Sequence, residues 1–195
     1  MENQVLEVIS KRRSIRKYKK GQISEEKLSL IIEAGRFAPS GGNNQTNHFI
    51  VIQNRETLQE LKLMVEKEFA KMEIKEDTYK SLKNSILASK KGGYDFTYNA
   101  PTFIVVANQK EYSNAMADCS VALENMMLAA TSLDIGSCWI NQLRWLDDNK
   151  SIHAYMMKLG LTENETICGG LALGYSQMSD MVPLKRTGNT VTYIK

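Results

Sequence analysis

The segment from Ser113 to Leu133 constrains the fold most, because it has the length of a helix and apolar residues on nearly every side. Its large apolar residues are Met116, Val121, Leu123, Met126, Met127 and Leu128. A helix that is hydrophobic all round has to be buried. We therefore expect it at the centre of the molecule or in a subunit interface. Glu124 and Asn125 interrupt the apolar stretch, which is too short and too polar to span a bilayer.

Strands and helices are predicted to alternate around this helix. Apolar runs bounded by turn residues predict strands, and these are His48–Ile52, Thr102–Ala107, Ser137–Ile140 and Cys168–Tyr175. Helical spacing predicts a helix that begins at the N-cap Ser24 and two more at Leu58–Met72 and Ile152–Leu159. With 195 residues, 43% of them hydrophobic, the chain fits one domain, 1–195, with a real core.

The stretch Lys11–Lys20 holds seven basic residues in ten positions and no acidic one. The chain has 25 Lys and Arg against 22 Asp and Glu, so removing this stretch leaves 18 against 22, a net charge of −4. The positive charge is therefore local. A short helix that includes Val5 and Ile9 runs into it, and cations suit a helix C-terminus. Seven cations exceed what capping needs, which favours an anion site.

Three interpretations of this basic stretch compete. A charge run is often a solvated face. Binding of nucleic acid needs basic residues spread along a face together with planar groups for stacking, and here only Tyr18 could stack. The third interpretation is a small phosphorylated ligand, because Arg binds phosphate bidentately and the Ser14 hydroxyl adds a neutral donor.

Common catalytic signatures are missing from the sequence. There is no GxGxxG or P-loop motif, and no Ser/His/Asp or Cys/His constellation is identifiable. His48 and His153 lie far apart and outside any Asp, Glu or Cys cluster, so no metal site is expected. The three cysteines are an odd number without CxxC spacing, and the polar N-terminus lacks the apolar region of a signal peptide. We expect reduced thiols in a cytoplasmic protein whose chemistry belongs to a cofactor.

Three other segments contribute to the candidate site. Ala38–Gln45 is a loop dense in backbone and amide donors. Pro183–Arg186 is a second small basic cluster, and the alternating tail Thr190–Ile194 is typical of an edge strand. From Glu73 to Gly93 the chain is charged and weakly patterned, and we expect the segment 74–99 to be a variable, mobile helical excursion or a lid that shapes the substrate pocket.

Several of these pieces together resemble the nitroreductase family of FMN-dependent oxidoreductases. Arg12–Tyr18 is similar to its N-terminal phosphate-binding motif, and Ala38–Gln45 to its flavin-edge loop. Gly136–Ile140 resembles the segment after its long central helix, and Gly170–Tyr175 with Pro183, Lys185 and Arg186 its closing strand and basic tail. One departure is Gln45-Thr46-Asn47, where the family often has Gln-Pro-Trp. The segment 74–99 matches nothing in the family.

The resemblance implies an α+β homodimer with a mostly antiparallel central sheet flanked by helices, a C-terminal tail exchanged between subunits, and FMN at the interface. The phosphate and ribityl chain would be held by Arg12, Arg13, Ser14, Lys185 and Arg186. Arg16 would lie near N1/O2 and tune the flavin. The flavin of the other subunit would be lined by Pro39, Ser40, Gly41 and Asn43. A backbone N–H near N5 would come from Ile140, Asn141 or Gln142.

The resulting hypothesis is ping-pong hydride transfer from NADH or NADPH, through FMN, to a small electron-poor acceptor such as a nitroaromatic or a quinone. No side chain has to act as a catalytic nucleophile. No nucleic acid, membrane or metal partner is expected. The alternatives are a flavin-binding protein reduced by a protein such as a ferredoxin, and a non-enzymatic basic-tailed binding protein.

Overall fold

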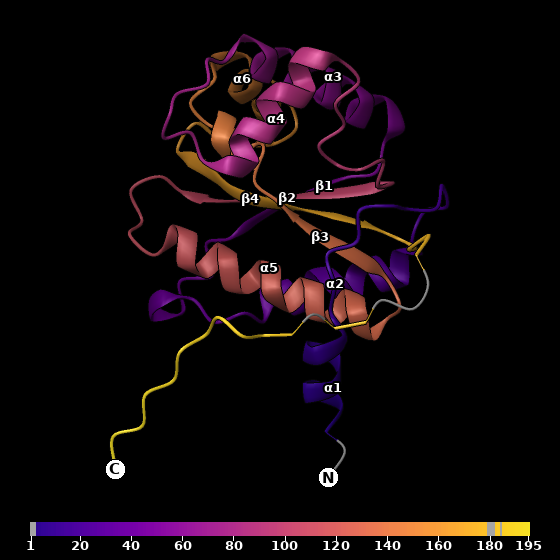
Figure 1. Ribbon diagram of the computed structural model, residues 1–195, viewed down its shortest axis with the longest axis vertical. Coiled ribbons are helices and arrows are strands. Elements are labelled where there is room, and N and C mark those ends of the chain that lie inside the picture. Colours follow the sequence, from indigo (N-terminus) through magenta and orange to yellow (C-terminus); the bar gives the residue numbers. More distant parts are fainter. Residues whose placement is uncertain (1–2, 179–181, 184) are drawn as a thin grey trace.

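A four-stranded antiparallel sheet forms the middle layer of the molecule (Figure 1), a computed structural model that describes residues 3–178, 182–183 and 185–195. Its strand order is β1-β2-β4-β3, and every neighbouring pair is antiparallel. The strands are β1 (His48–Ile52), β2 (Thr102–Gln109), β3 (Gly136–Ile140) and β4 (Glu165–Gly174). All four predicted strands are confirmed, and so is the α+β class.

Helices cover both faces of the sheet (Figure 1). The upper layer consists of α3 (Arg55–Lys71), α4 (Lys80–Lys91) and α6 (Lys150–Lys158). The lower layer consists of α2 (Glu25–Arg36) and α5 (Ala115–Ser132), with α1 (Gln4–Lys11) against α5. Two short 3-10 turns complete the elements, η1 (Gly41–Asn43) and η2 (Arg144–Leu146).

Side-chain caps fix where several helices begin. The predicted N-cap of α2 is confirmed, because the Ser24 hydroxyl accepts a hydrogen bond from the Lys27 N–H at 3.3 Å. Asparagine does the same for α1, α3 and α6, through Asn3, Asn54 and Asn149. A cap of this kind satisfies one of the N–H groups that have no partner inside the helix.

The central run of strand β2, Phe103–Ala107, is apolar because both faces of the strand are covered. Phe103 and Val105 point into the upper core, whereas Ile104 and Val106 point into the lower core, and all four are fully buried. This follows from the alternation of side chains along a strand. The continuous apolar run that predicted a buried strand is therefore explained by two helical layers rather than one.

Helix α5 packs one face against the sheet and α2, so the expected burial is confirmed for this face, which holds the 8 buried residues of its 18. Cys119, Leu123 and Met126 are fully inaccessible, whereas Val121 on the outer face is 39% exposed. Its outward face is mixed: Ala117 and Val121 are exposed, and the Glu124 side chain is 45% exposed. The lower layer thus ends in a surface that one chain leaves partly open.

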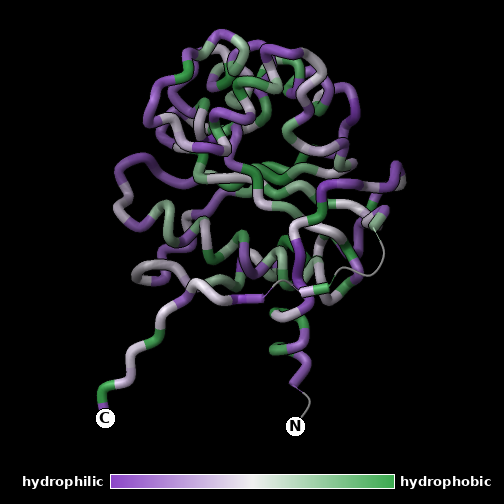
Figure 2. Tube along the Cα trace, viewed as in Figure 1, coloured by the Kyte–Doolittle hydropathy of each residue, from purple (hydrophilic) through white to green (hydrophobic). Residues whose placement is uncertain are grey.

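The two ends of the chain make few contacts with its body. None of the residues of α1 is buried, although Val5, Leu6 and Ile9 lie on it, and Figure 2 shows hydrophobic turns on this projecting helix. Residues 185–195 are exposed and extend away from the body (Figure 1). The expected edge strand at Thr190–Ile194 is not formed in the single chain, because no strand lies beside it to complete a ladder.

The segment 74–99 contains α4, as expected from its helical character. Ile86 and Phe96 are fully buried within the upper core, and α4 packs against α3. The segment is thus part of the core. Its role as a variable lid stays a prediction.

Candidate functional site

The basic stretch is held as an extended strip along the edge of the sheet. Ser14 forms a parallel bridge with Ser137 of β3, and Tyr18 forms an antiparallel bridge with Ser176. Ile15 and Tyr18 are buried, so the intervening Arg16 side chain points outward. The backbone approach is close: a Cβ on Gly136 would lie 2.9 Å from Ile15 Cγ1. Glycine at this position therefore lets the strip dock on β3.

Arg13 has the orphaned donors that an anion site requires. Its Nη1 donates to the Arg12 carbonyl, but its buried Nε and Nη2 have no partner among the described residues. The buried Ser137 hydroxyl also lacks one. Arg12 is paired only loosely, with its Nε 3.5 Å from Glu124 Oε1 on α5. Buried donors without partners are costly, and a phosphate held by Arg12, Arg13 and Ser14 would satisfy them.

Arg16 touches this group through one hydrogen bond, because its Nη1 donates to the Ser14 carbonyl at 3.5 Å. Its guanidinium carbon is 5.8 Å from the centre of the Tyr98 ring, which belongs to the loop before β2. The Tyr18 hydroxyl donates to the Ile15 carbonyl at 2.7 Å, and burial raises the pKa of this tyrosine, which keeps it neutral. The strip thus has two parts, Arg12–Ser14 next to β3 and the cations Arg16, Lys17 and Lys20, which line a cavity together with Tyr98.

The end of β3 carries the three residues expected near the flavin N5. Ile140 is buried, and Asn141 Oδ1 accepts a hydrogen bond from Trp139 Nε1 at 2.9 Å. Gln142 Nε2 donates to the Tyr94 hydroxyl at 2.8 Å. Burial raises the pKa of Tyr94, against the opposing effect of its hydrogen bonds. Both amide side chains are thus engaged within the protein, which sets the path of the backbone beyond β3.

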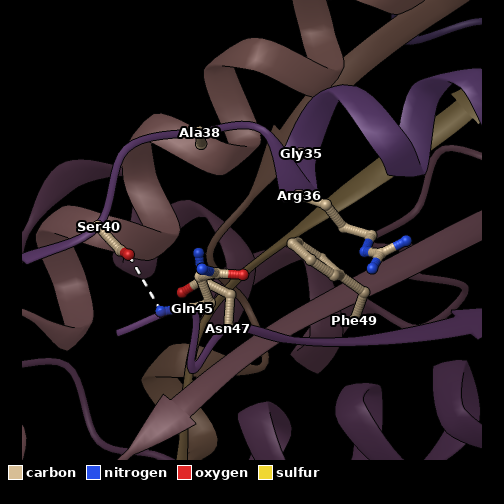
Figure 3. Close-up of a pocket in the computed structure, with 7 residues that line it drawn as sticks. All are labelled: Gly35, Arg36, Ala38, Ser40, Gln45, Asn47 and Phe49. Atoms are coloured by element: carbon tan, nitrogen blue, oxygen red, sulfur yellow. Dashed lines mark hydrogen bonds between the residues drawn. The ribbon is translucent and has the colours of Figure 1, made fainter. Parts of the chain in front are cut away.

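The loop Ala38–Gln45 is fastened to the first turn of α5. The Gly41 N–H donates to both carboxylate oxygens of buried Asp118 at 3.2 Å, and the Tyr112 hydroxyl donates to the Gly41 carbonyl at 3.1 Å. A Cβ on Gly41 would lie 2.3 Å from Asn114 Nδ2 and 2.5 Å from that hydroxyl, so a larger residue would displace these two side chains. Within the loop, Ser40 Oγ accepts from the Gln45 N–H at 3.0 Å (Figure 3).

A small cavity of about 150 Å³ lies under this loop (Figure 3). It is lined by Gly35, Arg36, Ala38, Ser40, Gln45, Asn47 and Phe49. Asn47, which stands where the family often has Trp, donates to the Asp118 carbonyl at 3.2 Å and accepts from Asn108 Nδ2 at 2.8 Å. Hydrogen bonds thus replace aromatic packing at this departure from the family pattern.

One chain does not bring the two parts of the expected site together. The strip pairs with β3 at one edge of the sheet, and the loop leads into β1 at the other edge. Three strand spacings of about 4.8 Å separate these edges by roughly 14 Å. Lys185 and Arg186 are exposed and make no ion pair or hydrogen bond with a described residue. Their convergence on Arg12 therefore stays a prediction.

Two residues that shape the site were not found from the sequence. Asp118 is hidden in the most apolar helix, where its only signal was a carboxylate in the first turn. Tyr98 lies in the segment without a pattern. Between residues 3 and 178 and in the described part of the tail, no group of three or more His, Cys, Asp or Glu is placed to hold a metal ion. No helix in these ranges is long and apolar enough to cross a membrane.

Known proteins share both the sequence pattern and the fold. The family model described as "Nitroreductase family" matches residues 9–175. An Archaeoglobus fulgidus protein with the provisional name NADH dehydrogenase/NAD(P)H nitroreductase is 34% identical over 180 residues, which are 87% of this chain and 84% of that one. A Bacteroides fragilis nitroreductase crystallised with bound FMN is 39% identical, with a TM-score of 0.87 and complete coverage of both chains. A Desulfitobacterium hafniense nitroreductase with bound FMN is 29% identical, with a TM-score of 0.84 and the same coverage.

These similarities and the sheet topology define an α+β protein of the nitroreductase fold. The chain belongs to the nitroreductase family. The family predicted from the basic strip, the loop and the closing strand is therefore confirmed.

Proposed function

We propose that this protein is an FMN-dependent oxidoreductase that takes a hydride from NAD(P)H and reduces a nitroaromatic, a quinone or a similar electron-poor acceptor. The observation that carries the proposal is the buried Arg13 guanidinium, whose Nε and Nη2 have no partner among the described residues. Family membership supports it, as do the FMN-bound relatives from B. fragilis and D. hafniense.

Each part of the site has one task in this proposal. Arg12, Arg13 and Ser14 hold the phosphate, with Lys185 and Arg186 closing over it. Arg16 places a positive charge at N1/O2. Backbone groups at Ile140, Asn141 and Gln142 lie along N5, and the partner subunit contributes Pro39, Ser40, Gly41 and Asn43. When bound, FMN supplies the hydride acceptor and donor chemistry, so donor and acceptor bind in turn in a ping-pong sequence.

The same proposal includes a homodimer of single-domain subunits, 1–195, in which the tail crosses onto the partner. Three observations support the dimer. α1 buries none of its residues although Val5 and Leu6 are each 64% exposed. Ile194 in the tail is 96% exposed. The strip and the loop lie at opposite edges of the sheet, so a second subunit can join them. The three buried, free cysteines suit a reducing, cytoplasmic setting.

The absorption spectrum of the purified protein, before and after anaerobic addition of NADH or NADPH, tests the reaction. We expect a flavin spectrum that bleaches with NAD(P)H, and FMN released on denaturation. A flavin that bleaches only with a protein reductant such as a reduced ferredoxin would replace this proposal with the electron-transfer alternative. Released FAD, or no flavin after reconstitution, would refute it.

A pair of variants separates the phosphate site from general surface charge. Arg13→Gln should raise the FMN dissociation constant about tenfold or more, because a charge-assisted contact is worth roughly 1.5–3 kcal/mol. Lys83→Gln, on the exposed face of α4, is the control and should leave FMN binding unchanged. Equal FMN affinity of the two variants would remove Arg13 from the site.

A further inference from the structure

A second, larger cavity lies on the side of Arg16 that faces Tyr98. Its volume of about 910 Å³ is at the upper end of the range for small-molecule sites. It opens between the basic strip, the start of α3 and the loop before β2. The residues Arg12–Ser14, proposed to bind phosphate, do not line it, and neither does the loop Ala38–Gln45.

The walls of this cavity are strongly cationic. Arg16, Lys17, Lys20, Arg55 and Lys62 line it, and the one lining carboxylate is Asp95. That carboxylate is already engaged, because it lies 2.8 Å from Lys62 Nζ and accepts hydrogen bonds from two backbone N–H groups. The other four cations form no ion pair with any described residue. Among the described residues, these four cations therefore have no paired carboxylate.

The wall facing Arg16 is an unusual turn. Asp95 accepts from the N–H groups of Thr97 and Asn99, and both Tyr98 (φ 57°) and Asn99 (φ 58°) are left-handed. Two consecutive non-glycine residues in this region cost energy, and such strain is concentrated at functional sites. Here the turn places the Tyr98 ring 5.8 Å from the Arg16 guanidinium.

Hydrogen-bonded amides fix the wall between the strip and the sheet. Gln22 Nε2 donates to the Pro101 carbonyl at 2.7 Å, and Gln22 Oε1 accepts from Thr102 Oγ1 at 2.8 Å. Gln53 Nε2 donates to the same two side chains at 3.2 Å. The chain before α3 is thereby tied to the start of β2, so Lys20 and Arg55 lie on a defined scaffold.

We propose that this cavity is a phosphate subsite for the electron donor, holding the diphosphate of NADH or NADPH. The inference rests on the proposed function. A dinucleotide donor brings at least two negative charges, whereas a nitroaromatic or quinone acceptor brings none that would need four cations. Arg16 belongs to both places, because it lines the cavity and is the residue assigned to the N1/O2 side of the flavin. The cavity therefore continues the flavin site away from the FMN phosphate.

The test is the double variant Lys20→Gln/Arg55→Gln in the FMN-loaded enzyme. Neither residue is among those proposed to bind FMN, so the FMN content of the variant should match that of the wild type. The KM for NADH and NADPH should rise about fivefold to tenfold with little change in kcat, as expected for two solvent-screened ionic contacts. Inorganic pyrophosphate should compete with NADPH in the wild type and should compete less well in the variant.

Two controls make the test specific. The phosphate-free donor 1-benzyl-1,4-dihydronicotinamide should reduce wild type and variant equally fast. Lys67→Gln removes an exposed cation of α3 that does not line the cavity and should leave every KM unchanged. An unchanged KM for both dinucleotides in the double variant would overturn the inference, and so would an equal loss with the phosphate-free donor. Absence of a flavin spectrum from the wild-type protein would instead contradict the proposed function. Failure of this inference and failure of the proposed function are therefore distinguishable.

Discussion

The two helical layers differ in how completely a single chain can bury them. The upper layer closes on itself: Phe69, Ile86 and Phe96 are fully inaccessible between α3, α4, α6 and the sheet. The lower layer buries the inner face of α5 equally well but ends in apolar surface, with Val5 and Leu6 of α1 each 64% exposed. The difference indicates that the upper layer supplies stability to one chain, and it supports our proposal that the lower layer meets a second copy.

The largest effect is expected from opening the upper core. Phe96→Ala should lower the free energy of unfolding by about 3–5 kcal/mol, because it leaves a cavity next to Phe103, whose ring centre is 5.4 Å away. Leu63→Ala, 55% exposed on α3, should change it by less than about 0.5 kcal/mol. Urea denaturation measures both. A small loss for Phe96→Ala would mean that the segment 74–99 is not part of the core.

Charged residues on α1 should weaken dimerisation and leave the stability of the single chain unchanged. Leu6→Glu/Ile9→Glu should raise the dimer dissociation constant by roughly a hundredfold or more, because two carboxylates would be buried in an apolar interface. The free energy of unfolding of the dissociated subunit should stay within about 0.5 kcal/mol, since both side chains are exposed there.

Sedimentation at several concentrations measures the dissociation constant, with Gln4→Glu as the control. Unaltered dimerisation of the double variant would exclude α1 from the interface.

At the edge of the sheet, Arg12 contacts α5 of the lower layer, whereas Arg16 contacts Tyr98 on the side of the upper layer. The two arginines are therefore expected to have different roles. Arg16→Ala should lower the flavin midpoint potential by roughly 30–60 mV, because a charge-assisted contact of about 1.5–3 kcal/mol to the reduced form is lost. Arg12→Ala should mainly raise the FMN dissociation constant.

Redox titration with excess FMN compares these two variants. Identical midpoint potentials in wild type and Arg16→Ala would mean that Arg16 binds the phosphate together with Arg12, Arg13 and Ser14.

The smallest effect is expected from the contact between Glu165 and His48 at the end of the sheet. Burial would raise the pKa of Glu165, but hydrogen bonds from the Thr162 N–H and His48 outweigh it and hold this pKa below its usual value near 4.5. The stability it contributes is present above pH 4.5 and is lost as pH falls through the lower folded-state pKa. Glu165→Gln should therefore cost less than about 1 kcal/mol at neutral pH and flatten the acid limb of the stability curve.

Acid titration of the free energy of unfolding measures this, with the exposed Glu163→Gln as the control. A steeper acid limb in Glu165→Gln than in wild type would contradict the assignment.

Periodicity was enough to predict most of the fold. The strand at Thr102–Ala107 and the helix at Ser113–Leu133 were recognisable because burial on both faces, or on nearly every side, leaves continuous apolar runs. The tail is a different case: the alternation at Thr190–Ile194 suits an edge strand, which the single chain does not form, since a strand also needs a neighbour. A pattern records a preference for pairing and cannot show which chain provides the partner.

The candidate site could be proposed from the sequence where it depends on short contiguous motifs, but not where it depends on packing. Arg12, Arg13 and Ser14 follow one another in sequence, so they could be proposed together as phosphate ligands, and this assignment stays a prediction. Tyr98 reaches Arg16 only because Asp95 builds a left-handed turn in a segment without periodicity. The cationic cavity joins residues from four separate segments, and no sequence spacing connects them.

The bridges that hold the basic strip also set when it can form during synthesis. Gln177 donates to the Tyr18 carbonyl across 159 positions, and Ser14 needs Ser137. At about 5–20 residues per second, the strip waits roughly 8–32 s for its last partner to be made. The residues proposed as the first cofactor contacts to be translated are thus among the last to be ordered. Nascent chains stalled before and after Gln177 has left the ribosome should differ in how well this strip resists proteolysis.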